Sequence, residues 1–185
     1  MSNLIVLCGL PGSGKTTLSE YLSDKLRFDV YRNDDFRKKL IKDPKYSVDE
    51  KLKVYNSVRQ VFEENGRDAI WDGTFYLPEF RNIVYDLHKT GDHYVVFVEA
   101  VCGLEEAKKR ITGREKDKYS MYDVKKFEQL VEDAISIYKD EYLFENKIPY
   151  ITYSTTSHQI LGEVNIDFLN EVYAKVIKAL ENFGE

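Results

Sequence analysis

Residues 9–16, with the sequence GLPGSGKT, occupy every fixed position of the phosphate-binding pattern G-x-x-x-x-G-K-[ST]. Glycines in this pattern let backbone N–H groups close around phosphates, and the helix that follows points its positive end at them. The apolar residues 4–8 predict a buried strand before the loop, and Leu18, Leu22 and Leu26 predict a helix after it. Because this is the context that the pattern requires, the sequence predicts a site for nucleotide phosphates.

Two polar residues of the run have predicted roles at that site. Lys15 is expected to reach the terminal phosphates, and the Thr16 hydroxyl to ligate Mg²⁺, so the expected cofactors are ATP and Mg²⁺. The predicted nucleotide-binding residues are Gly9, Pro11, Gly12, Ser13, Gly14, Lys15, Thr16 and Thr17. A glycine-rich turn that binds nothing is the weaker alternative, because the flanking strand and helix patterns are both present.

Short apolar strands alternate with helical patterns along the chain, which predicts an α/β fold with a parallel sheet covered by helices. The expected strands are residues 4–8, 30–31, 69–71, 94–98 and 150–153. Ser47 and Glu50 have the spacing of a capping box at a helix start, and Pro78 suits the first turn of another helix. With 185 residues, we predict one domain over residues 1–185.

Composition argues against several classes of protein. No apolar run approaches the length that spans a bilayer, and the first expected strand begins almost at Met1, so neither a membrane segment nor a signal peptide is predicted. The two cysteines, Cys8 and Cys102, form no C-x-x-C pair, and the three histidines lack the spacing of metal ligands. We therefore expect a cytoplasmic protein without a structural metal.

Asp34 and Arg37 form the second candidate group, just beyond the expected strand 30–31 and at the start of a helix. Strand ends of this kind border the ligand crevice of an open parallel sheet. A carboxylate there can accept the proton of an attacking hydroxyl, and an arginine three residues later lies on the same helix face. The alternative is that Asp34 merely caps the helix and that Arg37 is solvated.

Asp72 closes the apolar strand 69–71 and is the predicted partner of Thr16 in holding Mg²⁺. Glu99, which closes the strand 94–98, is the competing carboxylate. A third interpretation makes Asp72 a turn residue before Gly73.

Arg110 and Arg114 lie four residues apart, so a continuing helix would place both on one side. Arg110 precedes the polar stretch 113–120 and Arg114 lies within it, and this stretch has the composition of a mobile lid. Paired guanidinium donors suit the charge on a transferring phosphate, so both arginines are predicted to be catalytic. Basic residues near the end of a helix are also ordinary partners of the helix dipole. Phe75, Tyr76 and Tyr119 could stack on a base, although core packing is the simpler expectation for each of them.

Together these motifs resemble the P-loop kinases related to polynucleotide 5′-kinase, seryl-tRNA kinase and adenylylsulfate kinase. The resemblance implies a three-layer P-loop nucleoside-triphosphate hydrolase fold, with a five-stranded parallel sheet of the nucleoside-kinase type and a lid at about residues 113–120. It also implies that Asp34 is the general base, that Arg37 contacts the acceptor, and that Arg114 contacts the transferred phosphate. One position departs from the pattern, because Phe75 stands where polynucleotide kinases usually carry asparagine.

The favoured function is transfer of the γ-phosphate of ATP to a hydroxyl, with the 5′-hydroxyl of a polynucleotide end as the preferred acceptor. The mildly basic segments 27–53 and 105–126 would suit such a polyanion. A small-molecule acceptor, such as a nucleotide, a sugar or another metabolite, is the first alternative. A non-catalytic nucleotide switch is the second, although residues 146–149 (NKIP) lack the aspartate of the guanine-binding N-K-x-D signature.

Overall fold

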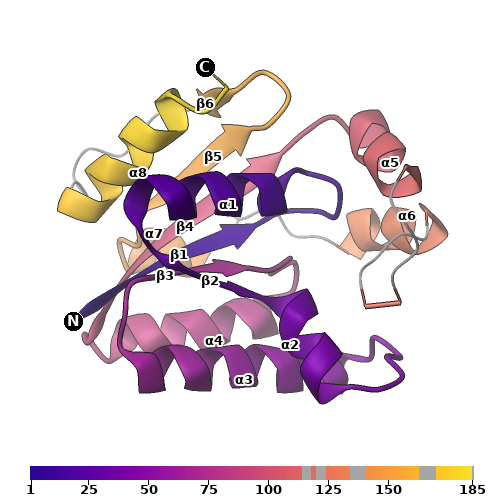
Figure 1. The fold of residues 1–185 in the computed structure, drawn as a ribbon, viewed down its shortest axis with the longest axis horizontal. Coiled ribbons are helices and arrows are strands. Elements are labelled where there is room, and N and C mark those ends of the chain that lie inside the picture. Colours follow the sequence, from indigo (N-terminus) through magenta and orange to yellow (C-terminus); the bar gives the residue numbers. More distant parts are fainter. Residues whose placement is uncertain (114–117, 120–123, 134–140, 163–169, 185) are drawn as a thin grey trace.

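The structure is a computed structural model that describes residues 1–113, 118–119, 124–133, 141–162 and 170–184. Its centre is one sheet with the strand order β2-β3-β1-β4-β5-β6 (Figure 1). The strands are β1 (Ser2–Cys8), β2 (Asp29–Arg32), β3 (Ala69–Asp72), β4 (His93–Val101), β5 (Tyr150–Ser154) and β6 (Gln159–Leu161). The first five pair in parallel, which confirms the predicted α/β architecture.

The sheet differs from the expectation in one respect, because it has six strands rather than five. β6 runs antiparallel to β5, with Ser154 opposite Gln159 and Thr152 opposite Leu161. Its three residues are partly or fully exposed, so β6 carries no run of buried apolar side chains from which a strand could be predicted. The extra strand covers the β5 edge of the sheet.

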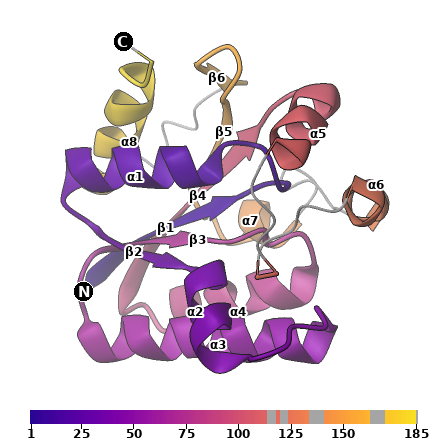
Figure 2. The same ribbon diagram turned by 45° about the vertical axis from the view of Figure 1, so that its right-hand side comes forward.

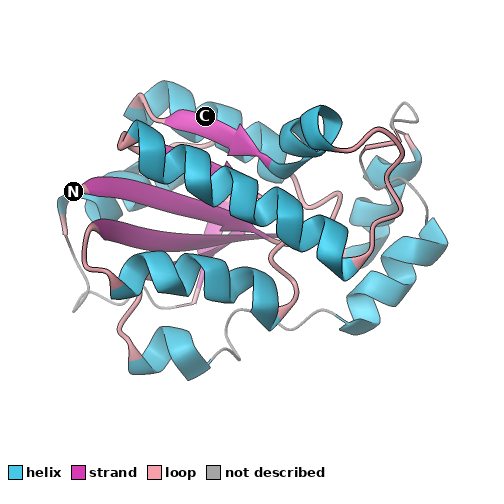
Figure 3. Ribbon diagram, turned by 90° about the horizontal axis from the view of Figure 1, so that it is seen from below, coloured by secondary structure: helices cyan, strands magenta, loops and turns pink. Residues whose placement is uncertain are grey.

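Helices cover both faces of the sheet and extend past its carboxyl-terminal edge (Figures 1 and 2). They are α1 (Lys15–Leu26), α2 (Asn33–Leu40), α3 (Val48–Asn65), α4 (Pro78–Lys89), α5 (Leu104–Thr112), α6 (Val124–Asp133), α7 (Glu141–Glu145) and α8 (Glu171–Glu181). α1 and α8 lie on one face, whereas α3 and α4 lie on the other (Figure 1). Seen from below, helices lie in front of the strands of the sheet (Figure 3). No helix within the described ranges has the length and apolar character needed to cross a membrane.

β1 shows how the sequence builds two cores around one sheet. Leu4 and Val6 point into the cluster formed with α3 and α4, whereas Ile5 and Leu7 point into the cluster formed with α1 and α8. This alternation follows from the two-residue period of a strand, and the continuous apolar run is typical of a parallel strand that is buried on both faces. Each fully buried Leu or Ile stabilises the fold by about 1.5–3 kcal/mol relative to an exposed one.

Two predicted helix starts are confirmed. Pro78 lies in the first turn of α4. At α3 the Ser47 hydroxyl accepts a hydrogen bond from the Glu50 backbone N–H at 3.2 Å. The Glu50 carboxylate in turn accepts from the N–H groups of Lys45 and Tyr46, at 2.8 and 3.3 Å. The turn before α3 is therefore fixed by its own side chains, and it holds Tyr46 at a left-handed φ of 60°.

The loop after β1 passes so close to β4 that it requires glycine at position 9. Gly9 has a φ of 135°, and a Cβ added there would lie 2.3 Å from the Ala100 carbonyl oxygen. We expect Gly9→Ala to lower the free energy of unfolding by about 2–4 kcal/mol, because backbone strain and a steric clash both oppose the native loop. Urea denaturation measures this loss.

Gly91→Ala is the matched control, because Gly91 has a φ of 74° but open space around the added methyl group. The control should lower the free energy of unfolding by only about 1 kcal/mol, because alanine there adopts the left-handed conformation without a steric clash. Equal losses for the two variants would contradict the close approach of the loop to Ala100.

Candidate active site

The phosphate loop joins β1 to α1 and is shaped by glycines with positive φ. Gly12 and Gly14 have φ values of 81° and 92°. α1 begins at Lys15, and among the residues that the structure describes no side chain caps its amino end. The first N–H groups of a helix have no partner within the helix, so this end is arranged to bind an anion.

Thr16 and Asp72, the two predicted metal-associated residues, lie together. Because Leu7 pairs with Asp72 in the sheet, the end of β3 lies beside the loop. The Thr16 hydroxyl donates a hydrogen bond to the Asp72 carboxylate at 3.2 Å. The competing carboxylate of Glu99 accepts a hydrogen bond from the Thr152 hydroxyl at 3.3 Å. The arrangement therefore favours Asp72, and a hydroxyl beside a carboxylate is an oxygen donor set that suits Mg²⁺.

Asp72 is buried, with 7% of its surface exposed. Burial raises the pKa of its carboxyl group, the Lys15 ammonium opposes that shift, and the Asp34 carboxylate adds to it. A cation bound at this carboxylate would favour its charged form. The electrostatics of Asp72 thus also fit a site for a metal ion.

Asp34 and Arg37 lie in the first turns of α2, which begins directly after β2. They form an ion pair, and Arg37 also donates a hydrogen bond to the Tyr119 carbonyl oxygen at 2.9 Å. The Tyr46 ring lies 5.0 Å from the guanidinium group. Arg37 is buried rather than solvated, and no side chain in the described part of the chain caps the start of α2. The simpler interpretations of both residues are therefore contradicted.

The ionisation of Asp34 is set by its place in the pocket. Burial raises the pKa of its carboxyl group, and the charge and hydrogen bond of Arg37 oppose that shift. Its side chain nevertheless remains half exposed, so the carboxylate can meet a ligand.

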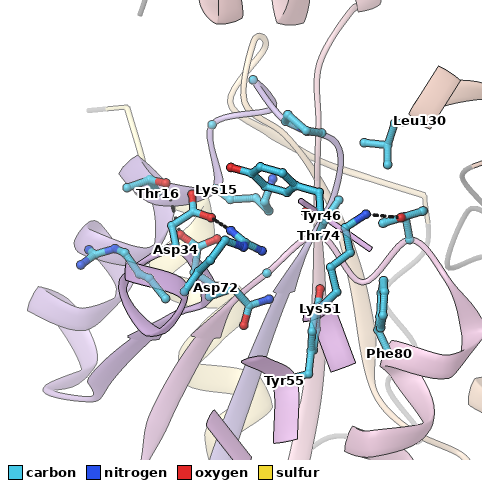
Figure 4. A pocket seen from close by; sticks show the side chains of 18 residues that line it. Lys15, Thr16, Asp34, Tyr46, Lys51, Tyr55, Asp72, Thr74, Phe80 and Leu130 are labelled. Atoms are coloured by element: carbon cyan, nitrogen blue, oxygen red, sulfur yellow. Dashed lines mark hydrogen bonds and ion pairs between the residues drawn. The ribbon is translucent and has the colours of Figure 1, made fainter. Parts of the chain in front are cut away.

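These groups line one pocket, which is open to solvent (Figure 4). Its lining includes eight predicted site residues, which are Pro11, Gly12, Gly14, Lys15, Thr16, Asp34, Arg37 and Asp72. The predicted residues Gly9, Ser13, Thr17 and Arg110 lie outside the lining. Thr17 is exposed on α1, whereas Ser13 is buried within the loop.

Arg110 contacts the phosphate loop and is not part of the pocket lining. Its guanidinium donates hydrogen bonds to the Glu106 carboxylate at 2.9 Å and to the Gly12 carbonyl oxygen at 3.3 Å. It also contacts the hydroxyl of Thr155, which donates to the Ser13 carbonyl oxygen at 2.6 Å. The other predicted arginine, Arg114, lies outside the described residues, as does most of the predicted lid at 113–120.

Three buried donors beside the site have no hydrogen-bond partner within the described part of the chain: the Ser13 hydroxyl and the Nε atoms of Arg32 and Arg37. Buried polar groups are normally paired, so each of these donors requires an explanation. Arg32 and Arg37 line the pocket, whereas Ser13 does not, so the oxygen atoms of a bound anion would reach the two Nε atoms only after these buried side chains move.

Other pocket residues were not predicted from the sequence, chiefly Tyr46, Lys51, Tyr55 and Leu130. They come from α3, the turn before it and α6, and they follow no known motif. The left-handed backbone of Tyr46 marks a constrained site, but it becomes visible only in the structure. Of the aromatic residues considered for base stacking, Tyr76 lines the pocket and Phe75 is buried in the core.

A family model described as "AAA domain" matches residues 4–134 of the chain. The match includes the phosphate loop, Asp34, Arg37, Asp72 and Arg110. The chain therefore belongs to this family of P-loop proteins.

Curated relatives and solved structures agree with that assignment. Shikimate kinase of Clostridium botulinum is 30% identical over 148 residues, which cover 73% of this chain and 82% of the relative. The structure of a sugar kinase from Janibacter superimposes with a TM-score of 0.62 at 13% identity, covering 96% of this chain and 91% of that one. APS kinase of Mycobacterium tuberculosis, in complex with AMPPNP and APS, gives 0.54 at 19% identity, covering 60% and 69%.

The fold, the phosphate loop and these relatives define the chain as an ATP-dependent P-loop kinase. ATP and Mg²⁺ are the cofactors of this class.

Proposed function

We propose that the protein transfers the γ-phosphate of ATP to a hydroxyl group of a small organic acceptor, with Asp34 as the general base. The observation that carries this proposal is the position of Asp34, whose half-exposed carboxylate shares one pocket with Lys15 and Thr16 of the phosphate loop. A carboxylate so placed can meet an acceptor hydroxyl beside the terminal phosphate.

The proposed reaction is an in-line displacement. The acceptor oxygen attacks the γ-phosphorus, its proton passes to the Asp34 carboxylate, and the bond between phosphorus and the β–γ bridging oxygen breaks to release ADP. Lys15 binds the terminal phosphates, and Arg37 orients the Asp34 carboxylate through their ion pair. Thr16 and Asp72 would hold Mg²⁺, which supplies charge neutralisation on the phosphates when bound.

The lining of the pocket and the relatives favour a small acceptor over a polynucleotide end. Besides Asp34, the described lining of the pocket includes Tyr46, Phe80 and Leu130, which offer aromatic and apolar surface to a small organic acceptor. The relatives are named for shikimate, a sugar and APS, which are all small molecules. The polynucleotide acceptor that the sequence favoured has no support among them.

Acceptor-stimulated ATP consumption tests the proposal. The protein, ATP and Mg²⁺ are incubated with a panel of sugars, sugar acids, cyclic hydroxy acids, nucleosides and nucleotides, and with a 5′-hydroxyl oligonucleotide. We expect at least one small compound to raise ADP release and to gain one phosphoryl group by mass. Phosphorylation of the oligonucleotide alone would overturn the choice of acceptor.

The pH dependence of the reaction should report Asp34. A general base works in its deprotonated form, so kcat/KM for the acceptor should fall as the pH drops through the raised pKa of Asp34. Arg37→Gln removes the group that most strongly lowers this pKa, and we expect the acidic limb to move to higher pH. A pH–rate profile at saturating ATP measures the shift.

Lys39→Gln is the control, because Lys39 is exposed on the same helix and does not line the pocket. Its profile should match that of the wild type. An acidic limb that stays in place in Arg37→Gln would mean that Asp34 is not the titrating base.

A further inference from the structure

The side of the pocket away from the phosphate loop has a distinct chemistry. We call it the acceptor wall, and it comprises Tyr46, Lys51, Tyr55, Tyr76, Phe80 and Leu130. In Figure 4, Lys51, Tyr55, Phe80 and Leu130 lie across the pocket from Thr16 and Asp34. Four of its six members are aromatic and one is aliphatic, so Lys51 is its single charged member.

Lys51 has no acidic partner among the described residues. Its ammonium donates a hydrogen bond to the Tyr76 hydroxyl at 2.8 Å and lies 5.1 Å from the centre of the Tyr76 ring. By contrast, Arg37 is paired with Asp34, and Arg32 contacts Glu20 at 3.2 Å. An ammonium has three donors, so Lys51 keeps donors for a ligand.

The wall offers little to a neutral polyol. None of its members carries a carboxylate or a side-chain amide, whereas the Asn33 amide and the Thr74 hydroxyl line the same pocket outside the wall. The Tyr55 hydroxyl already accepts a hydrogen bond from the Phe75 N–H at 3.0 Å, and the Tyr46 hydroxyl donates to the Lys118 carbonyl oxygen at 2.5 Å. A neutral acceptor would therefore leave the Lys51 ammonium without a charged partner in a partly desolvated pocket.

We propose, on the basis of the proposed function, that the acceptor carries an anionic oxygen group, such as a carboxylate, phosphate or sulfate, on a compact ring or apolar frame. The anionic group binds Lys51 beside Tyr76, and the frame packs against Tyr46, Phe80 and Leu130. The hydroxyl to be phosphorylated then faces Asp34 across the pocket. Lys51 is thus a specificity-determining residue.

Matched pairs of acceptors test this proposal, because the two members differ in charge but share a frame. The first pair is shikimate and its methyl ester, and the second is 4-(hydroxymethyl)benzoate and its amide. Each compound is assayed for acceptor-stimulated ADP release, and its binding to the complex of the protein with AMPPNP is measured by calorimetry. We expect the acidic member to be preferred in both assays.

Two variants, Lys51→Met and Lys51→Arg, test whether Lys51 causes the preference for the acidic member of each pair. Losing a charge-assisted hydrogen bond should lower kcat/KM for the acidic member about 10- to 100-fold in Lys51→Met, mainly through KM, and leave the neutral member little changed. Lys51→Arg should keep the preference. Lys53→Met is the control, since Lys53 is exposed on the same helix and lies outside the pocket lining. Thermal unfolding verifies that each variant is folded.

The outcomes separate this inference from the proposed function. A neutral member that is preferred in turnover or binding, or an equal loss for both members in Lys51→Met, would overturn the anionic acceptor while leaving the kinase intact. If acidic compounds bind through Lys51 yet no compound is phosphorylated, the anionic subsite stands and the proposed transfer fails. If no acidic compound binds, the subsite itself is refuted.

Discussion

Asp34→Asn is expected to lower acceptor-dependent kcat by about 10²- to 10⁴-fold, the usual contribution of a general base. An asparagine keeps the shape of the side chain but cannot take the proton of the acceptor hydroxyl. ATP binds through the phosphate loop, so its dissociation constant should stay near that of the wild type. Steady-state kinetics and titration with AMPPNP measure the two effects separately.

Asp35→Asn is the matched control for this variant. Asp35 is exposed on the same helical turn, and its contact is an ion pair with Arg32 at 4.0 Å. Its removal should leave turnover nearly unchanged. Undiminished turnover in Asp34→Asn would contradict the proposed base and would favour a nucleotide switch, which needs no acceptor base.

Lys15→Met should lower kcat/KM by at least about 10²- to 10³-fold, the loss seen when a donor that stabilises transition-state charge is removed. The Lys15 ammonium lies in the pocket and donates a hydrogen bond to the Leu10 carbonyl oxygen at 2.8 Å. We expect it to turn to the terminal phosphates when ATP binds. The variant should therefore also bind ATP more weakly, which titration with AMPPNP measures.

The control here is Lys25→Met, which removes a lysine from the exposed far end of α1. It should alter neither ATP binding nor turnover. Because the hydrogen bond from Lys15 to Leu10 lies within the loop, thermal unfolding is compared as well. A Lys15→Met protein that unfolds at a much lower temperature would mean that the lysine is structural, and unchanged ATP binding would place the nucleotide elsewhere.

The phosphate-loop side of the site could be predicted because local sequence determines it. Residues 9–16 form one continuous motif, Asp34 lies two residues beyond the end of β2, and Asp72 is the last residue of β3. In a parallel sheet the carboxyl ends of neighbouring strands meet at one edge, so the position of each carboxylate follows from the strand pattern. Thr16 and Asp72 lie within hydrogen-bond distance because the pairing of β1 with β3 brings the end of β3 beside the phosphate loop.

The acceptor wall could not be predicted in the same way. Lys51 and Tyr55 lie one turn apart on α3, and Leu130 comes from α6, so the wall exists only after distant segments have packed together. The contacts of Arg110 could not be predicted from the sequence either, because its hydrogen bond to the Gly12 carbonyl oxygen joins residues that are far apart along the chain. Its predicted contact with the transferred phosphate stays a prediction.

Transfer of isotopically labelled γ-phosphate from ATP to a small acceptor tests the central claim most directly. The wild-type protein and Asp34→Asn are incubated with labelled ATP, Mg²⁺ and the acceptor that stimulates ADP release best, and the products are separated and weighed by mass spectrometry. We predict that the wild type places the label on a hydroxyl of the acceptor and that Asp34→Asn does so at least about 100-fold more slowly. Label that appears only as inorganic phosphate, at the same rate in both proteins, would contradict the account.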